Sequence, residues 1–182
     1  MKRIIIILLL AAPFSVYSQE PLSYSEVIEV SGVDKNELFI RGREWFNENF
    51  KSSKDVLQIM DKETGELAGK AYMVVDCTFK LMVVRTVPAG VYFQVNLWIK
   101  DGKYKYEISN FNVPGGENFS TLMVNLGVIT TSNETTKIVH GVPAKRLNET
   151  YSSIKASTEQ QALLLIMNLK EKMSKSSKST NW

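Results

Sequence analysis

The sequence predicts an α+β domain in which two helices pack on one face of a single antiparallel sheet. Two regions, residues 34–50 and 151–169, repeat apolar residues at the three- and four-residue spacing of an amphipathic helix. Between them, four or five segments alternate apolar and polar residues with the period of two that is typical of strands. The resulting element order is β-α-β-β-β-β-α, in one domain spanning residues 19–173.

The first strand and the first helix are predicted at residues 24–30 and 34–50. Asp34 is followed three residues later by Glu37, which is close to the capping-box pattern at helix starts. Trp45 lies on the apolar side of the helical repeat. We therefore interpret it as a core residue rather than part of a binding site.

The remaining strands are predicted in the middle of the chain, at 56–60, 67–75, 79–87, 91–99 and 103–111. Polar turn residues at 61–65 separate the first two of these segments. Pro88 and Gly90 are expected to end one strand before the next begins at residue 91. The last two segments are joined by Asp101-Gly102, the preferred pair for a type I′ hairpin turn. A two-residue turn places Lys100 opposite Lys103.

This register divides the hairpin into an apolar face and a mixed face. Leu97 and Tyr104 belong to the apolar face, which we expect to be core. The mixed face combines aromatic rings with cations, and helices on the other side would leave it open to a ring, a sugar or a protein loop. We call its members the predicted surface: Tyr92, Trp98, Lys100, Lys103, Lys105 and Phe111.

The C-terminal third is harder to interpret. Residues 112–147 have no regular pattern apart from a possible strand at 121–130, and such a long connection is often functional or mobile. The second helix is expected to begin near Tyr151, or at the Ser157-Thr158-Glu159-Gln160 start signal. Residues 174–182 are rich in Lys and Ser and are expected to form a flexible tail.

Residues 1–18 have the organisation of a secretory signal peptide. Lys2 and Arg3 precede an apolar run from Ile4 to Ala12, and Val16-Tyr17-Ser18 suits a signal-peptidase site. The run is shorter than the roughly 20 residues of a spanning helix. We expect secretion across the inner membrane, a periplasmic or extracellular protein beginning at Gln19, and no transmembrane span.

The rest of the composition argues against several function classes. Cleavage after Ser18 lowers the basic count from 22 to 20 against 19 acidic residues, so no strongly basic surface for nucleic acid is expected. The single cysteine, Cys77, sits in an apolar stretch and is interpreted as core. With His140 as the only histidine, the common zinc sites and a Ser-His-Asp site lack support. We therefore predict no catalytic residue, metal site or cofactor.

Five stretches carry a family resemblance: 24–30, Glu44-Trp45-Phe46, 50–56, 99–104 and 106–111. Together they resemble a secreted family of unknown function from Bacteroidetes whose members are described as having a TATA-box-binding-protein-like (TBP-like) fold. The resemblance covers roughly residues 24–111 and implies the fold. It implies no catalytic residues, because none is assigned in that family, and the fold by itself does not imply DNA binding.

These observations favour a non-enzymatic binding or assembly module of the envelope, acting on a protein or a small ligand through the predicted surface or residues 112–147. One alternative is an enzyme or inhibitor acting on envelope polymers, which requires two carboxylates to converge in a pocket, one with a raised pKa. Another is a structural subunit that forms a homodimer through the open face. A further alternative is that residues 112–147 fold over the predicted surface and cover it.

Overall fold

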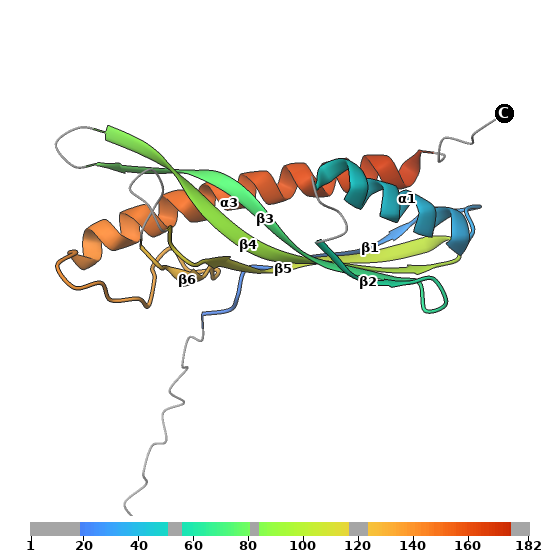
Figure 1. Cartoon of the computed structure of the whole chain (residues 1–182), viewed down its shortest axis with the longest axis horizontal. Helices are drawn as coiled ribbons and strands as arrows, with labels where there is room; N and C mark the ends of the chain where they lie inside the picture. The colour runs from blue at the N-terminus through green and yellow to red at the C-terminus, as the bar shows by residue number, and fades with distance from the viewer. Residues whose placement is uncertain (1–18, 51–55, 81–83, 117–123, 176–182) are drawn as a thin grey trace, which may run out of the picture.

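The computed structural model describes residues 19–50, 56–80, 84–116 and 124–175. The predicted signal peptide and residues 176–182 of the predicted tail lie outside them. The elements in chain order are β1 (Tyr24–Glu29), α1 (Lys35–Asn49), β2 (Leu57–Asp61), β3 (Glu66–Lys80), β4 (Val84–Lys100), β5 (Lys103–Val113), β6 (Gly127–Val128) and α3 (Ala144–Ser174) (Figure 1).

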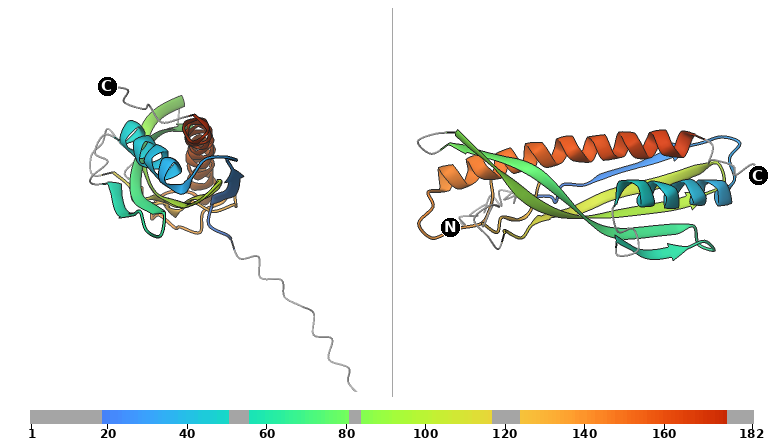
Figure 2. Two further views of the ribbon diagram at one scale, coloured as in Figure 1. Left: turned by 90° about the vertical axis from the view of Figure 1, so that its right-hand side faces the viewer. Right: turned by 45° about the horizontal axis from the view of Figure 1, so that its top comes forward.

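The strands form one antiparallel sheet in the order β1-β5-β4-β3-β2, and β6 pairs with β5. The sheet is strongly twisted, α3 runs along its length on one face, and α1 lies beside the C-terminal half of α3 (Figure 2). The core lies between the helices and this face, and we call the opposite side the outer face. The α+β prediction of two helices on one face of an antiparallel sheet is therefore confirmed for the described residues.

The predicted strand at 79–87 is not a separate element. Its first two residues end β3, and Val84 onward belongs to β4, where Pro88 and Gly90 are interior residues paired with β3. Pairing of β4 with β5 begins only at Tyr92, so the earlier part of β4 has β3 as its only neighbour among the described strands. A proline is tolerated on such an edge because no ladder partner needs its missing N–H.

The first helix begins where the sequence predicts. The Asp34 carboxylate accepts a hydrogen bond from the Glu37 N–H at 2.9 Å, which satisfies one of the free donors of the first turn. A Cβ at Gly42 would lie 2.9 Å from a Leu67 methyl, so glycine lets α1 approach the sheet closely. Trp45 is fully buried, as expected for a core residue.

The hairpin has the predicted register but not the predicted turn. Lys100 pairs with Lys103, yet only Gly102 has a positive φ, whereas a type I′ turn requires one at Asp101 as well. The Asp101 carboxylate instead accepts the Lys35 N–H at 2.8 Å, and the Gly102 N–H donates to the Val33 carbonyl. Contacts with the start of α1 thus decide the turn conformation.

A β-bulge in β5 contradicts the prediction for Phe111. Tyr92 pairs with Asn112 but Gln94 with Ser109, so two β5 residues oppose one β4 residue. Asn110 absorbs the extra residue with a φ of 58°. Beyond the bulge, each β5 side chain points to the face opposite to the one predicted. Phe111 therefore points into the core, where it is fully buried.

The C-terminal helix is longer than predicted. It begins at Ala144, after the N-cap residue Pro143, because Leu147 extends the apolar repeat by one turn onto the core. At 31 residues, α3 spans about 46 Å. It also includes Ser174, the first residue of the predicted tail.

Only part of the expected strand at 121–130 is present in the described residues. Gly127–Val128 form β6, and Thr130 makes an isolated antiparallel bridge with Pro21. Residues 121–123 lie outside the description. The N-terminal residues thus pair with this segment, a long-range contact that no local pattern indicates.

The bulge makes Asn110 sensitive to β-branched substitution. We expect Asn110→Val to unfold more easily than Asn110→Gly by about 1–2 kcal/mol, because left-handed backbone is costly for residues with a Cβ and worst for branched ones. Urea denaturation of both variants measures the difference in the free energy of unfolding. Equal stabilities would show that the positive φ does not hold Phe111 in the core.

Candidate functional site

Trp98 and Lys105 form the centre of the predicted surface. They are cross-strand partners on β4 and β5, and the Lys105 Nζ lies 5.0 Å from the Trp98 ring centroid. An ammonium at this distance is attracted by the electron-rich ring face. The register deduced for the hairpin therefore places these side chains correctly.

A concavity of about 270 Å³ opens around this pair. We call it the Trp98 concavity; it is lined by Val27, Trp98, Lys100, Lys103, Tyr104 and Lys105. It brings together four of the six residues of the predicted surface. Val27, on β1, was not foreseen, because the sequence does not reveal that β1 pairs with β5.

The lysines of the Trp98 concavity are exposed and make no ion pair with any residue that the structure describes. Most other described lysine contacts join elements, such as Lys172 with Glu44 and Glu48 between α3 and α1. Lys105 instead lies over the Trp98 ring, and Glu29 is the ladder partner of Lys103. The charges of the lysines of the Trp98 concavity are available to an anionic group from outside.

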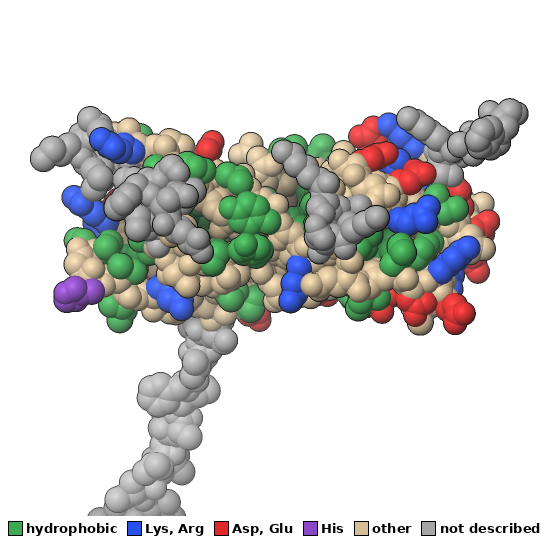
Figure 3. Space-filling view, in the orientation of Figure 1, with side chains coloured by type: hydrophobic (Ala, Val, Ile, Leu, Met, Phe, Trp, Pro, Cys, Tyr) green, Lys and Arg blue, Asp and Glu red, His purple; other side chains and the backbone are tan. Residues whose placement is uncertain are grey.

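The other two members of the predicted surface lie elsewhere. Tyr92 is on the outer face, but it is six residues from Trp98 along β4, about 20 Å at ~3.3 Å per residue. It is half-exposed and contacts Tyr72, with ring centroids 5.0 Å apart. Phe111 is in the core and stacks on Phe93 at 5.8 Å. Figure 3 shows hydrophobic side chains gathered over β3 and β4.

The described part of residues 112–147 does not line the Trp98 concavity. It packs instead at the far end of β5, where the Leu126 N–H donates to the Val113 carbonyl and the Ile129 N–H to the Phe111 carbonyl. The expectation that this segment folds over the predicted surface is therefore wrong for the residues around Trp98, as far as the description extends.

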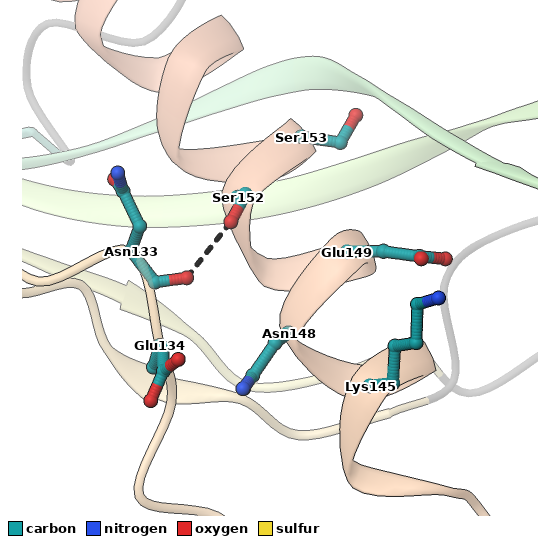
Figure 4. Close-up of a pocket in the computed structure, with 7 residues that line it drawn as sticks. All are labelled: Asn133, Glu134, Lys145, Asn148, Glu149, Ser152 and Ser153. Carbon is teal, nitrogen blue, oxygen red and sulfur yellow. Dashed lines mark hydrogen bonds between the residues drawn. The ribbon is translucent and has the colours of Figure 1, made fainter.

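A second, shallower groove of about 800 Å³ lies between the 133–134 loop and the first half of α3. All seven lining residues carry polar or charged side chains, so we call it the polar groove: Asn133, Glu134, Lys145, Asn148, Glu149, Ser152 and Ser153 (Figure 4). Two Asn-Glu-Thr tripeptides, starting at Asn133 and Asn148, supply much of it, and the Thr135 N–H donates to the Asn148 side chain at 3.2 Å. The repeated tripeptide was the available sequence signal.

The groove contains two carboxylates, as the enzyme alternative requires, but that alternative also needs a raised pKa. Among the described carboxylates, hydrogen bonds lower the pKa of Glu26, Asp61 and Glu171, chiefly those from Lys170, Thr64 and Lys175 respectively. His140 is exposed. No described group of His, Cys, Asp and Glu side chains is arranged to hold a metal ion. The enzyme alternative stays a prediction.

Comparison with known proteins agrees with this fold. Residues 24–113, from β1 through β5, match a family model described as a domain of unknown function (DUF4468) with TBP-like fold. The chain carries a DUF4468 domain. The match contains the Trp98 concavity and ends before β6 and α3, so the polar groove lies outside it. No curated protein sequence matches the chain.

Two solved structures resemble most of the chain, beyond the DUF4468 match itself. A TBP-like protein from Parabacteroides distasonis ATCC 8503 aligns with a TM-score of 0.60 at 12% identity, covering 86% of this chain and 95% of its own. A DUF4468 family protein from Bacteroides ovatus ATCC 8483 aligns with a TM-score of 0.57 at 15% identity, covering 87% and 89% respectively. At these identities the likeness establishes the TBP-like fold and no activity. Neither described helix is long and apolar enough to cross a membrane.

Cys77 is fully buried, as predicted, and burial raises the pKa of its thiol to about 11. An unfolded thiol ionises near pH 8.5, so unfolding is favoured as pH rises from there towards 11. We expect the free energy of unfolding in urea to fall by about 1 kcal/mol between pH 7 and 9.5 through this group. Cys77→Ala lacks this part of the decline; an equal decline in both proteins would contradict the assignment.

Proposed function

We propose that this protein is a secreted, non-enzymatic binding module of the cell envelope that captures its partner in the Trp98 concavity. The observation that carries the proposal is the combination of an aromatic ring with three lysines free of ion pairs on the face that the helices leave open. Such a site suits a partner that presents an anionic group beside an apolar or aromatic one.

The arrangement favours binding over a purely structural role. Lys105 already lies over the Trp98 ring, so the ring is held in place before a partner arrives. Tryptophan and cationic side chains contribute disproportionately to protein interfaces because they combine large contact area with strong polar interactions. The concavity has walls on three neighbouring strands, which limits the loss of conformational freedom on binding.

Secretion is the second part of the proposal, and it rests on the sequence of residues 1–18. A charged start, a short apolar run and the Val16-Tyr17-Ser18 end have the three-part organisation of a cleavable signal. We therefore place the protein in the periplasm or outside the cell.

One prediction of this proposal concerns processing. Protein recovered from the envelope fraction of its own host is expected to begin at Gln19, because signal peptidase prefers small residues such as Ser18 before the cut. N-terminal sequencing or intact-mass measurement identifies the first residue. Unprocessed protein retained in the cytoplasm would contradict secretion.

Another prediction of this proposal concerns capture of the partner. Trp98→Ala combined with Lys105→Ala is expected to reduce crosslinked adducts of the protein in intact host cells at least about tenfold, as loss of an interface hot spot does. Quantitative mass spectrometry of the purified adducts measures this. Both side chains lie outside the core, so circular dichroism should be unchanged.

Matched controls are Tyr92→Ala, on the same face but away from the concavity, and Lys145→Ala in the polar groove. Both are expected to retain the adducts. Adducts that persist in the Trp98→Ala, Lys105→Ala variant would remove the concavity as the binding site, and adducts lost only in Lys145→Ala would move it to the groove.

A further inference from the structure

β1 is an edge strand without the protection that other edges of this sheet have. β4 carries Pro88 on its unpaired part, and β2 has a bulge between Leu57 and Ile59. The free edge of β3 is blocked by Ser153 and Ser157 of α3, whose hydroxyls hydrogen-bond β3 backbone groups at 2.9 and 2.8 Å. Within the described residues, β1 has no proline, bulge or hydrogen-bonded neighbour on its free side. It forms the margin of the sheet (Figure 2, left).

The ladder identifies the free backbone groups of β1. The Val30 N–H donates to the Gly102 carbonyl at 2.8 Å, so residue 30 directs its backbone groups towards β5. Because alternate residues of an antiparallel pair face the partner, Ser25, Val27 and Glu29 direct theirs away from β5. Three N–H and three C=O groups are thus presented along one edge.

The free edge adjoins the Trp98 concavity. Val27 opposes Lys105 in the ladder, lines the concavity and is 58% exposed. A strand added at β1 would lie about 4.8 Å from β1 and about 10 Å from β5. Its outward side chains would sit beside Val27, within reach of the flexible Lys103 and Lys105 side chains.

We propose that β1 captures an extended, acidic segment of a partner protein as an additional strand, by β-augmentation. Backbone hydrogen bonds to Ser25, Val27 and Glu29 provide the attachment, and the lysines of the Trp98 concavity select carboxylates on the outward side. This inference rests on the proposed function, for which it names the class of partner.

Of the two β1 carboxylates, only Glu29 shares the outer face with an added strand, and its ladder partner is Lys103. Lys103 offsets the charge of Glu29, which leaves Lys105, opposite Val27, and Lys100 for the carboxylates of a partner. Glu26 is held by Lys170 and the Tyr106 hydroxyl on the core side, and it does not face the outer surface. The free cations belong to β5 and the β4 end, one strand away from the edge.

Two fluorescent heptapeptides test the charge preference, one alternating Glu with Val and the other Lys with Val. In fluorescence anisotropy at low salt, the Glu-Val peptide is expected to bind residues 19–182 at least tenfold more tightly. The Lys103→Glu, Lys105→Glu variant should reverse the preference. Equal binding of the two peptides, or no binding of either, would overturn the proposal.

Val27→Pro tests the edge itself, because it removes an outward N–H while leaving the bonds to β5 intact. Its affinity for the Glu-Val peptide is expected to fall about tenfold, whereas the matched Val27→Thr variant, which keeps the N–H, should bind nearly as the original. If Val27→Pro disturbs folding, a peptide with N-methylated backbone on alternate residues applies the same test from the ligand side.

Hydrogen exchange separates this proposal from the function on which it depends. Bound Glu-Val peptide is expected to slow exchange of the Ser25, Val27 and Glu29 amides at least tenfold. Unprotected amides, or a Val27→Pro variant that binds normally, would overturn strand addition. Capture at the Trp98 concavity would still stand in that case if the Trp98→Ala, Lys105→Ala variant loses its adducts in cells.

Discussion

The rest of the structure depends on the burial of one apolar sheet face under α3. The strands β3, β4 and β5 present a continuous row of apolar side chains to this face, and the apolar stripe of α3 from Leu147 to Met173 lies along it. Burying an aliphatic or aromatic side chain contributes roughly 1.5–3 kcal/mol, so this interface dominates the stability of the domain. Arg41 joins α1 to this interface by donating to the Met173 carbonyl of α3 at 2.8 Å.

Covering one face leaves the other exposed, and this asymmetry creates the candidate site. The outer face cannot be wholly polar, because its strands still need β-forming residues, and it retains half-exposed Tyr72, Tyr92 and Val27. The Trp98 concavity forms where three strands meet beside the hairpin. The Asp101 carboxylate, by binding the start of α1, fixes that hairpin against the body of the domain.

The edges of the sheet differ in how they are protected against the addition of another strand. Proline, a bulge and serine side chains each prevent an unwanted strand from adding at one edge, a common need in open sheets. Among the residues that the structure describes, β1 has no proline, bulge or blocking side chain on its free edge, and it adjoins the Trp98 concavity. In the proposed strand addition, backbone groups would supply the affinity and a few side chains the selectivity.

The sequence by itself determined the α+β class, the start of α1 at Asp34, the hairpin register and the pairing of Trp98 with Lys105. These depend on local signals: a cap, a period of two and a two-residue turn. The fate of Phe111 depended on a bulge at Asn110, which is stable only because the core accepts the inverted side chain. Likewise, Val27 lies beside the hairpin lysines only because β1 pairs with β5, about 80 residues away in sequence. Such long-range pairing is selected by the packing of the whole sheet under α3, so only the tertiary structure decided it.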